Sequence, residues 1–350
     1  MRAGSLDTWA DILFSCDPPV PSCCWIELSA MAYLIGTDEA GYGPFLGPLV
    51  IATSVWQVPD LEVDLRDHFG GETGTFPEDV SLPVVIDDSK RVFKRQRGLG
   101  TLEHTVLPAL ATTLPGSGSP ASWRSLWHQL APGSEKVLNE LPWYQDFDVA
   151  IPTGIEAAVV DEVTEQLRSF WKRVNVRLLR LQAVALFPPQ FNEEVEQYGG
   201  KGELLTRQTL DLVRRQVSTL EGEPILIQCD KHGGRNYYGP ALQEAFPEYL
   251  VEVRRESRAQ SVYRWGPPEQ RTEICFTAKG DSFLPAALAS MAAKYLRELA
   301  MQAFNAYWCE RLPSLQPTAG YPADARRFKE EIAQVQAAEK ISDAILWRNR

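Results

Sequence analysis

The chain has 350 residues, of which 44% are hydrophobic and 23% are charged, and its formal net charge is −11 at pH 7. This composition is ordinary for a soluble globular protein, and the length suffices to bury a full core in one large domain or two. The negative charge excludes nucleic-acid binding driven by the field of the whole protein, so local basic clusters and metal ions would have to hold a polyanionic partner. No apolar run approaches the roughly 20 residues of a membrane span. The six cysteines show no CxxC pair, which argues against structural zinc and favours a reducing, cytoplasmic compartment.

Residues 1–30 fit neither a signal peptide nor a folded domain. Their apolar segments are interrupted by Asp17 and by three prolines, and a cationic start is barely present. Met31 stands immediately before the first predicted strand. We therefore interpret residues 1–30 as an N-terminal extension that precedes the true translation start.

The first strand is predicted over Leu34–Thr37, and two adjacent acids, Asp38 and Glu39, follow it. Neighbouring side chains on a regular strand point to opposite faces, so these acids are expected to converge only where the pleat fails. Gly41 and Gly43 stand where such a failure is expected, and glycine backbone can approach a ligand closely. An acid pair beside open backbone suits a divalent cation and a phosphate.

The later elements alternate between strand and helix patterns. In chain order we predict a strand at 49–56 antiparallel to the first, a weak helix near 101–113, an amphipathic helix at 155–174, a strand at 176–187, a helix at 203–217, a fully buried strand at 224–229, two or three strands within 251–278, a long helix at 283–312 and one or two helices within 322–346. Residues 95–150 are interpreted as an insertion with its own small cluster. This pattern predicts an α/β fold with a mixed sheet flanked by helices.

Two further acids occupy the ends of predicted elements. Asp230 ends the predicted buried strand and precedes a Gly-Gly turn, and Asp281 lies between a strand and the long helix. Four carboxylates at one edge of a sheet, with Asp38 and Glu39, would need cations to remain ionised together, and hard cations such as Mg²⁺ or Mn²⁺ prefer oxygen ligands. Each acid also has a plain structural interpretation, because Asp281 could be a helix N-cap and Asp230 could stabilise its turn.

The ordered series of motifs resembles the type 2 ribonuclease H family, the HII and HIII group. The matching segments are Gly-Thr-Asp-Glu-Ala-Gly at 36–41 with the glycines and prolines of 43–50, Asp-Ser-Lys at 88–90, Asp230 after its strand, Lys-Gly-Asp at 279–281 with the helix that follows, and Gly-Tyr-Pro at 320–322. The resemblance implies a ribonuclease H-like fold. It also implies a two-metal endonuclease that cuts the RNA strand of RNA·DNA hybrids to leave 5′-phosphate and 3′-hydroxyl ends.

By position in these motifs, the catalytic and metal-binding residues would be Asp38, Glu39, Asp230 and Asp281. The expected cofactor is Mg²⁺ or Mn²⁺, and the expected partner is RNA·DNA hybrid, bound by a cytoplasmic monomer without membrane contact. The residues expected to contact nucleic acid are Gly41, Tyr42, Gly43, Ser89, Lys90, Arg235, Lys294 and Tyr321.

The chain departs from the family pattern in three places. Tyr42 stands where the HII enzymes carry an arginine between two glycines, so the positive arm is missing at that position. Insertions are expected at about 95–150 and at 240–271, within a catalytic domain of 31–327 that a C-terminal helix at 328–350 follows. Two alternatives therefore stay open: a catalytically inactive or repurposed nucleic-acid-binding protein, and a DNA structure-selective nuclease on the same fold.

Overall fold

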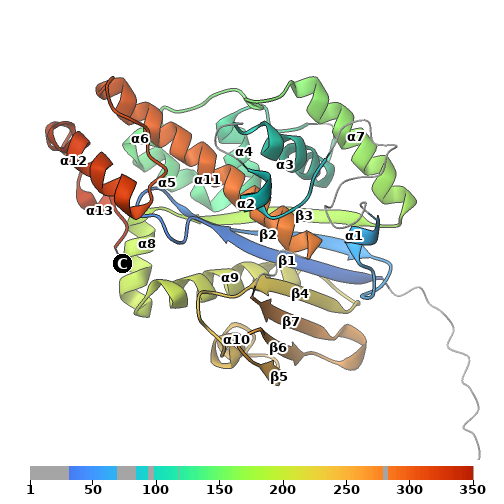
Figure 1. Cartoon of the computed structure of the whole chain (residues 1–350). Coiled ribbons are helices and arrows are strands. Elements are labelled where there is room, and N and C mark those ends of the chain that lie inside the picture. The colour runs from blue at the N-terminus through green and yellow to red at the C-terminus, as the bar shows by residue number, and fades with distance from the viewer. Residues whose placement is uncertain (1–30, 69–83, 94–97, 117, 279–282, 350) are drawn as a thin grey trace, which may run out of the picture.

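A computed structural model describes residues 31–68, 84–93, 98–116, 118–278 and 283–349 (Figure 1). The strands are β1 Ala32–Ala40, β2 Leu49–Val58, β3 Arg177–Leu186, β4 Ile225–Asp230, β5 Glu252–Glu256, β6 Gln260–Trp265 and β7 Thr272–Thr277. The helices are α1 Leu65–His68, α2 Ser89–Val92, α3 Gly100–Thr113, α4 Trp123–Leu130, α5 Glu135–Glu140, α6 Pro142–Gln145, α7 Ala157–Arg173, α8 Pro188–Tyr198, α9 Lys201–Val217, α10 Gly239–Ala245, α11 Leu284–Arg311, α12 Pro322–Ala338 and α13 Asp343–Leu346, with short 3₁₀ turns at Pro132–Ser134 and Pro268–Gln270.

Within these described residues the strands form one seven-stranded sheet in the order β3-β2-β1-β4-β7-β6-β5. The first three strands are antiparallel, β4 and β7 run parallel to β1, and the β5–β6 hairpin extends the edge by antiparallel pairing with β7. Helices cover both faces of the sheet (Figure 1). The predicted fold class, a mixed sheet flanked by helices, is confirmed. None of the described helices combines the length and apolar character needed to cross a membrane.

Alternate residues of the strands contribute to separate cores on the two faces of the sheet, and Leu49 and Ile51 of β2 belong to a third cluster with α8 and α9. On β1, Leu34 faces the larger core under α11, α3 and α7, whereas Ile35 faces the core under α9 and α10. The same alternation on β2 places Trp56 in the first core and Val55 in the second. A strand with both faces covered reads as a nearly continuous apolar run, which is why β1 and β2 could be recognised in the sequence.

Most predicted elements are confirmed, but the interpretations of β4 and of residues 95–150 are wrong. The strand predicted as fully buried, β4, alternates between buried and half-buried residues, because α11 lies mainly across β1 and β2 and leaves one face of β4 partly open. The described residues of the predicted insertion, 98–116 and 118–150, do not form a cluster of their own. Trp123, Trp127 and Tyr144 belong to the same large core as α11 and β3, and the Trp123 indole donates to the carbonyl of Leu299 in α11.

The C-terminal segment is not separate from the rest of the fold. The boundary predicted between residues 327 and 328 lies inside α12. After α13 the chain returns to the end of β1, where the backbone N–H of Arg348 donates to the carbonyl of Phe45 at 2.9 Å. This return brings a C-terminal arginine to the loop that follows the acid pair.

The helix α11 crosses β1 in direct backbone contact at Gly36. A Cβ atom at Gly36 would lie 2.1 Å from the backbone nitrogen of Ala286 and from the carbonyl carbon of Pro285. The adjacent strand β2 also binds the start of α11, because the Ser54 hydroxyl donates a hydrogen bond to the carbonyl of Pro285 at 2.7 Å. Only glycine at position 36 permits this approach, which fixes where α11 lies relative to Asp38.

Replacing Gly36 with alanine is therefore expected to destabilise the protein. The methyl group would force β1 and α11 apart, and overpacking of this kind costs about 1–3 kcal/mol. Urea denaturation of Gly36→Ala should show a lower free energy of unfolding. Gly133→Ala is the matched control, because no atom lies within 4 Å of its Cβ position. Equal stability of the two variants would contradict the close packing of α11 on β1.

Candidate active site at the carboxyl edge of the sheet

Two acidic side chains meet where neighbouring parallel strands end. β1 and β4 pair with Thr37 opposite Cys229, so Asp38 and Asp230 are the next residues on the two strands. Asp38 lies on the face covered by α11, because residues two apart on a strand share a face and Gly36 touches α11. Asp230 is the last residue of β4. The structure therefore brings together two of the four acids that the sequence singled out.

The Asp38 carboxyl group is oriented by the Ser290 hydroxyl, which the Ser89 hydroxyl contacts in turn. Asp38 is 9% exposed and accepts a hydrogen bond from the hydroxyl of Ser290 in α11. The Ser290 hydroxyl lies 2.9 Å from the hydroxyl of Ser89, the first residue of α2. Ser89 is buried, so it supports the orientation of Asp38 through Ser290, whereas the sequence led us to expect a contact with nucleic acid.

Glu39 follows Asp38 on β1 without a break in the strand. β1 and β2 stay in regular register as far as Ala40 opposite Val50, so the expected failure of the pleat at the acid pair does not occur. That prediction is wrong because both acids still have antiparallel partners on β2, and the strand ends only at the glycine that follows Ala40. The charges of Asp38 and Asp230 nevertheless act on Glu39 from across the strand ends.

Burial dominates the electrostatics of these acids. It raises the pKa of Asp38 from 3.8 to about 7, and the charge of Asp230 acts in the same direction against the hydrogen bond from Ser290 and the charge of Lys90. Burial raises the pKa of Glu39 from 4.5 to about 8, and the charges of Asp38 and Asp230 add to the effect. A nearby positive charge lowers the pKa of such buried carboxyl groups and so helps them to release their protons.

The glycine-rich loop after β1 is held by two buried arginines. Gly41 has a φ of +93°, and a Cβ there would lie 2.5 Å from Nε of Arg297. Arg348 donates from Nη2 to the carbonyl of Gly41 at 2.7 Å, and burial, with the charge of Arg297, lowers the pKa of Arg348 to about 9. Gly43 is exposed, and the atom nearest to its Cβ position belongs to the Tyr321 ring at 3.9 Å. The loop therefore presents open backbone beside the acids.

The Tyr42 ring packs beside the first residue of α9, Lys201, which carries a positive charge. Nζ of Lys201, the first residue of α9, lies 4.7 Å from the centre of the Tyr42 ring. The Tyr42 hydroxyl approaches backbone that lacks side chains, at 3.7 Å from the Cβ position of Gly202 and 3.9 Å from that of Gly233. Burial and the charge of Glu39 raise the pKa of Tyr42. Lys201 of α9 therefore places a positive charge beside the Tyr42 ring.

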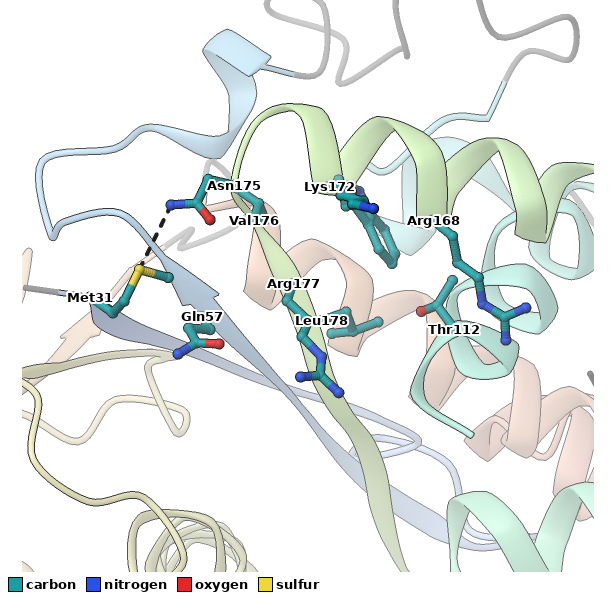
Figure 2. A pocket seen from close by; sticks show the side chains of 10 residues that line it. Met31, Gln57, Thr112, Arg168, Lys172, Asn175, Val176, Arg177 and Leu178 are labelled. Atoms are coloured by element: carbon teal, nitrogen blue, oxygen red, sulfur yellow. Dashed lines mark hydrogen bonds between the residues drawn. The ribbon is translucent and has the colours of Figure 1, made fainter. Parts of the chain in front are cut away.

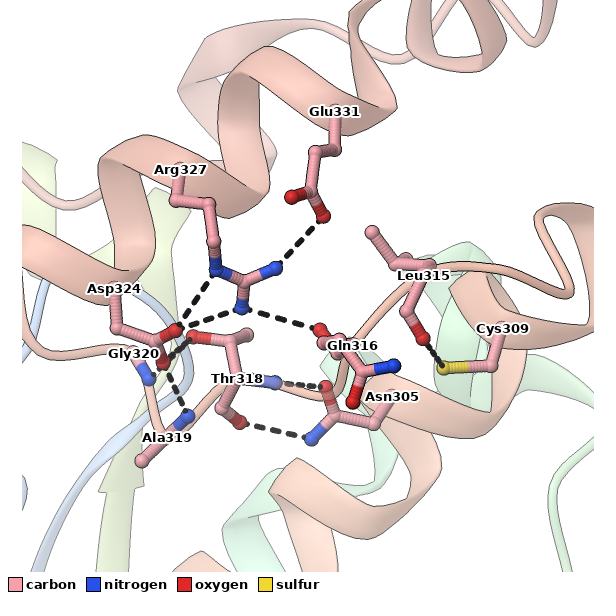
Figure 3. A network of polar contacts seen from close by, with 10 residues as sticks. All are labelled: Asn305, Cys309, Leu315, Gln316, Thr318, Ala319, Gly320, Asp324, Arg327 and Glu331. Atoms are coloured by element: carbon pink, nitrogen blue, oxygen red, sulfur yellow. Dashed lines mark hydrogen bonds and ion pairs between the residues drawn. The ribbon is translucent and has the colours of Figure 1, made fainter.

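A polar network that includes Thr318, Ala319 and Asp324 surrounds the start of α12, next to Tyr321 in the sequence (Figure 3). The Asp324 carboxylate accepts hydrogen bonds from the Thr318 hydroxyl at 2.6 Å and from the backbone N–H of Ala319 at 3.0 Å. The carbonyl of Gly320 in turn accepts the backbone N–H of Phe45 at 2.7 Å. This network fixes the Gly-Tyr-Pro segment against the glycine-rich loop. The Tyr321 ring stays 54% exposed at the surface beside it.

The three basic residues predicted to contact nucleic acid occupy different environments. Lys90 is exposed on α2, and its charge lowers the pKa of both Asp38 and Glu39. Lys294 is partly buried against Glu298 and lies 4.8 Å from the Phe93 ring. Arg235 is paired with Glu203 of α9. Lys90 is therefore the basic side chain that combines exposure with a direct influence on the acids.

His232, two residues after Asp230, is a structural residue. Its Nδ1 lies 3.0 Å from the Thr206 hydroxyl, and its backbone N–H donates to the Tyr238 hydroxyl at 3.1 Å. Burial, with a contribution from the charge of Arg235, lowers the pKa of His232 to about 3. A histidine that stays neutral and hydrogen-bonded in this way packs the turn after β4 and is not available as a general base.

The donor chemistry of the edge fits a hard cation. The acids supply oxygen ligands only, and a bound cation would offset the burial that raises the pKa values of Asp38 and Glu39. Asp281 lies outside the described residues. Among the residues that are described, no three His, Cys, Asp or Glu side chains form a metal-holding group by themselves. A complete coordination shell therefore requires ligands beyond the described side chains, from Asp281, water or substrate.

A cavity of about 410 Å³ lies at the opposite end of the sheet (Figure 2). It is lined by Met31 at the start of β1, Gln57 near the end of β2, and the basic side chains Arg168, Lys172 and Arg177. The lining includes no acid, histidine or cysteine. The chemistry of the carboxyl edge therefore has no counterpart in this cavity.

Comparison with solved structures gives distant similarities. The chain is similar to RNase HII from Archaeoglobus fulgidus, solved as a complex with PCNA, at 14% identity, 91% coverage of this chain, 94% of that chain and a TM-score of 0.38. It is similar to ribonuclease H2 from Pyrococcus horikoshii OT3 at 14% identity, with 90% and 92% coverage and a TM-score of 0.37. It is also similar to Bst-RNase HIII in complex with Mn²⁺ at 12% identity, with 94% and 70% coverage and a TM-score of 0.37. No family model and no curated protein sequence matches the chain.

Four residues that shape this edge were not among the candidate site residues of the sequence interpretation: Ser290, Lys201, Arg297 and Arg348. Ser290 could have been noticed as a hydroxyl in an alanine-rich helix, and Arg297 as a charge on the same mainly buried helix. No local pattern marks Lys201 or Arg348, because only the three-dimensional return of α9 and of the C-terminus brings them to the loop.

Proposed function

We propose that the chain is a metal-dependent endonuclease that hydrolyses the RNA strand of RNA·DNA hybrids and leaves 5′-phosphate and 3′-hydroxyl ends. The observation that carries this proposal is the pair Asp38 and Asp230, side by side at the ends of parallel strands and next to exposed glycine backbone. The order of the sequence motifs that resemble type 2 ribonuclease H supports a nuclease over other phosphoryl-transfer chemistry.

In this proposal Asp38, Glu39, Asp230 and Asp281 hold Mg²⁺ or Mn²⁺. The cations would supply Lewis-acid stabilisation of the charge that develops on the phosphate. The chain's own contribution is to fix the Asp38 carboxylate by the hydrogen bond from Ser290, and to keep the acids in a buried setting where electrostatic interactions are strong.

The substrate strand would lie across the exposed glycine backbone. Gly43 is open to a sugar, Tyr321 presents an exposed ring beside it, and Lys90 offers a positive charge near the acids for a phosphate. Hybrid duplexes are read through groove shape and 2′-hydroxyl groups, which glycine backbone can approach at hydrogen-bonding distance. Lys201 beside Tyr42 would compensate the charge missing at position 42.

The decisive experiment is a set of duplexes of one sequence that contain no, one, several or many ribonucleotides, each tested with Mg²⁺ and with Mn²⁺. We expect cleavage of the ribonucleotide-rich strand, with 5′-phosphate and 3′-hydroxyl product ends, and no cleavage of all-DNA duplex. Equal cleavage of all-DNA duplex would instead indicate a DNA nuclease. Binding of every duplex without cleavage under either metal would indicate a repurposed binding protein, and either result would overturn the proposal.

A further inference from the structure

The β5–β6 hairpin ends at the same edge of the sheet as the acids. Asp230 on β4 is paired with Thr277 on β7, and Thr277 is paired with Gln260 at the start of β6. These three residues therefore form one row across the sheet. Since neighbouring strands lie about 4.8 Å apart, the hairpin turn at 257–259 stands about 10–15 Å along the edge from Asp230. Figure 1 shows β7, β6 and β5 in succession beyond β4.

The turn is tied to the residue that follows Asp230. Nζ of the buried Lys231 donates to the carbonyl of Ser257 at 2.6 Å, to Oδ1 of Asn236 at 2.9 Å and to the hydroxyl of Ser261 at 3.1 Å. The backbone N–H of Ala278 also donates to the carbonyl of the turn residue Ala259 at 3.0 Å. The turn thus has a fixed position relative to the acid site.

The hairpin presents positive charge on a chain that is negative overall. Arg254, Arg255 and Arg258 are all exposed, and every residue of β5 is exposed. Their contacts are weak, since Arg255 reaches Gln260 at 3.4 Å and Arg254 reaches Glu252 at 4.0 Å. β5 also carries Glu252 and Glu256, of which Glu252 lies near Arg254 and Glu256 accepts a hydrogen bond from the Tyr263 hydroxyl. Arg255 on β5 and Arg258 on the turn remain exposed, and on a chain of net charge −11 they form a local site for a polyanion.

We infer that the β5–β6 hairpin is an arm that binds phosphates of the nucleic-acid duplex engaged at the acids. Arg258 on the turn and Arg255 beside it on β5 are the positioning residues. They act on duplex binding and not on the chemical step. The identity of the polyanion rests on the proposed function, but the surface itself follows from the strand register and from the contacts of Lys231. Phosphate contacts of this kind carry no sequence preference.

The arginines also have a purely structural interpretation. β5 is the outer strand of the sheet, and charged side chains on an edge strand prevent pairing with other chains. This interpretation predicts that loss of the arginines causes aggregation and leaves duplex binding unchanged. If the hairpin binds phosphates, loss of the arginines should instead weaken duplex binding while the protein remains monomeric.

The test measures binding of fluorescent RNA·DNA hybrid by anisotropy in the presence of EDTA, from about 50 to about 200 mM salt. Arg255→Ala/Arg258→Ala should bind about tenfold more weakly at the low-salt end, and the slope of log Kd against log salt should fall by about 2. The charge-reversed pair Arg255→Glu/Arg258→Glu should lose more. Lys172→Ala/Arg177→Ala removes equal charge at the opposite end of the sheet and should behave as wild type (Figure 2).

The inference that the hairpin binds phosphates would be overturned by unchanged affinity and salt slope in both arm variants, or by a wild type that does not bind duplex. Cleavage by the wild type is measured in parallel with Mn²⁺. If the wild type cleaves and the arm variants bind as well as the wild type, only the inference about the hairpin is overturned. If the arm variants bind more weakly and the wild type does not cleave, only the nuclease proposal is overturned.

Discussion

Asp38→Asn is expected to lose about three orders of magnitude or more in kcat on an RNA·DNA hybrid. The amide removes a negative oxygen ligand from the edge shared with Asp230, and metal-assisted charge stabilisation contributes several kcal/mol to such reactions. The fold should survive the change. Asparagine is nearly isosteric, can still accept the hydrogen bond from Ser290, and relieves the burial of a carboxyl whose pKa is raised to about 7.

Gel-based cleavage assays with Mg²⁺ and with Mn²⁺ check this expectation, together with thermal unfolding of each protein. Asp211→Asn on the exposed side of α9 is the matched control, because it makes the same chemical change far from β1. Full activity in Asp38→Asn would show that the acids are structural. Loss of activity in both variants would point to a general defect of the preparation.

The sequence predicted the sheet well where local periodicity carries the information. β1, β2, β3 and the long helix α11 follow from apolar runs and helical spacing, and their order predicts a mixed sheet. The placement of residues 95–150 could not be predicted in this way. Trp123 and Trp127 read as a local cluster, yet they complete the core under α11, a contact between residues more than 150 positions apart.

The acid site could be predicted in part for the same reason. Strand ends mark Asp38 and Asp230, and parallel pairing of β1 with β4 brings them together without further information. Ser290 is visible in the sequence as a hydroxyl in an alanine-rich helix, but its contact with Asp38 could not be predicted, because that contact depends on α11 crossing β1 at Gly36. Arg348 was beyond reach because a C-terminal side chain folds back onto the loop after β1.

The position of the β5–β6 hairpin could not be predicted from the sequence, for a further reason. Its arginines are visible in the sequence as an unusual feature of 240–271, but charge alone does not say which edge of the sheet they reach. The register of β6 on β7 decides this, and the buried Lys231 fixes the turn beside Asp230. A basic stretch becomes a candidate binding surface only when strand pairing gives it a direction.

Metal-free protein is expected to lose stability as the pH rises from about 4 to about 8, and Mn²⁺ is expected to restore it. The pKa values of Asp38 and Glu39 are raised to about 7 and about 8, so the folded state keeps protons that the unfolded state has already released. Stability falls with pH wherever the folded state binds more protons. A shift of about three pKa units corresponds to a loss on the order of 4 kcal/mol for Asp38. Lys90 reduces this loss and Asp230 increases it.

Urea denaturation in EDTA at pH 5 and at pH 8, repeated with Mn²⁺, measures this effect without any assay of activity. Comparison with Asp38→Asn measures the contribution of that carboxyl together with the effect of its charge on Glu39. The wild type should lose more stability between the two pH values than Asp38→Asn, and Mn²⁺ should stabilise the wild type more at pH 8 than at pH 5, because ionised carboxylates bind the cation and protons compete with it. An identical pH dependence in the two proteins would show that the Asp38 carboxyl is not held out of water as the packing of α11 on β1 requires, and the case for a buried acidic metal site would fall with it.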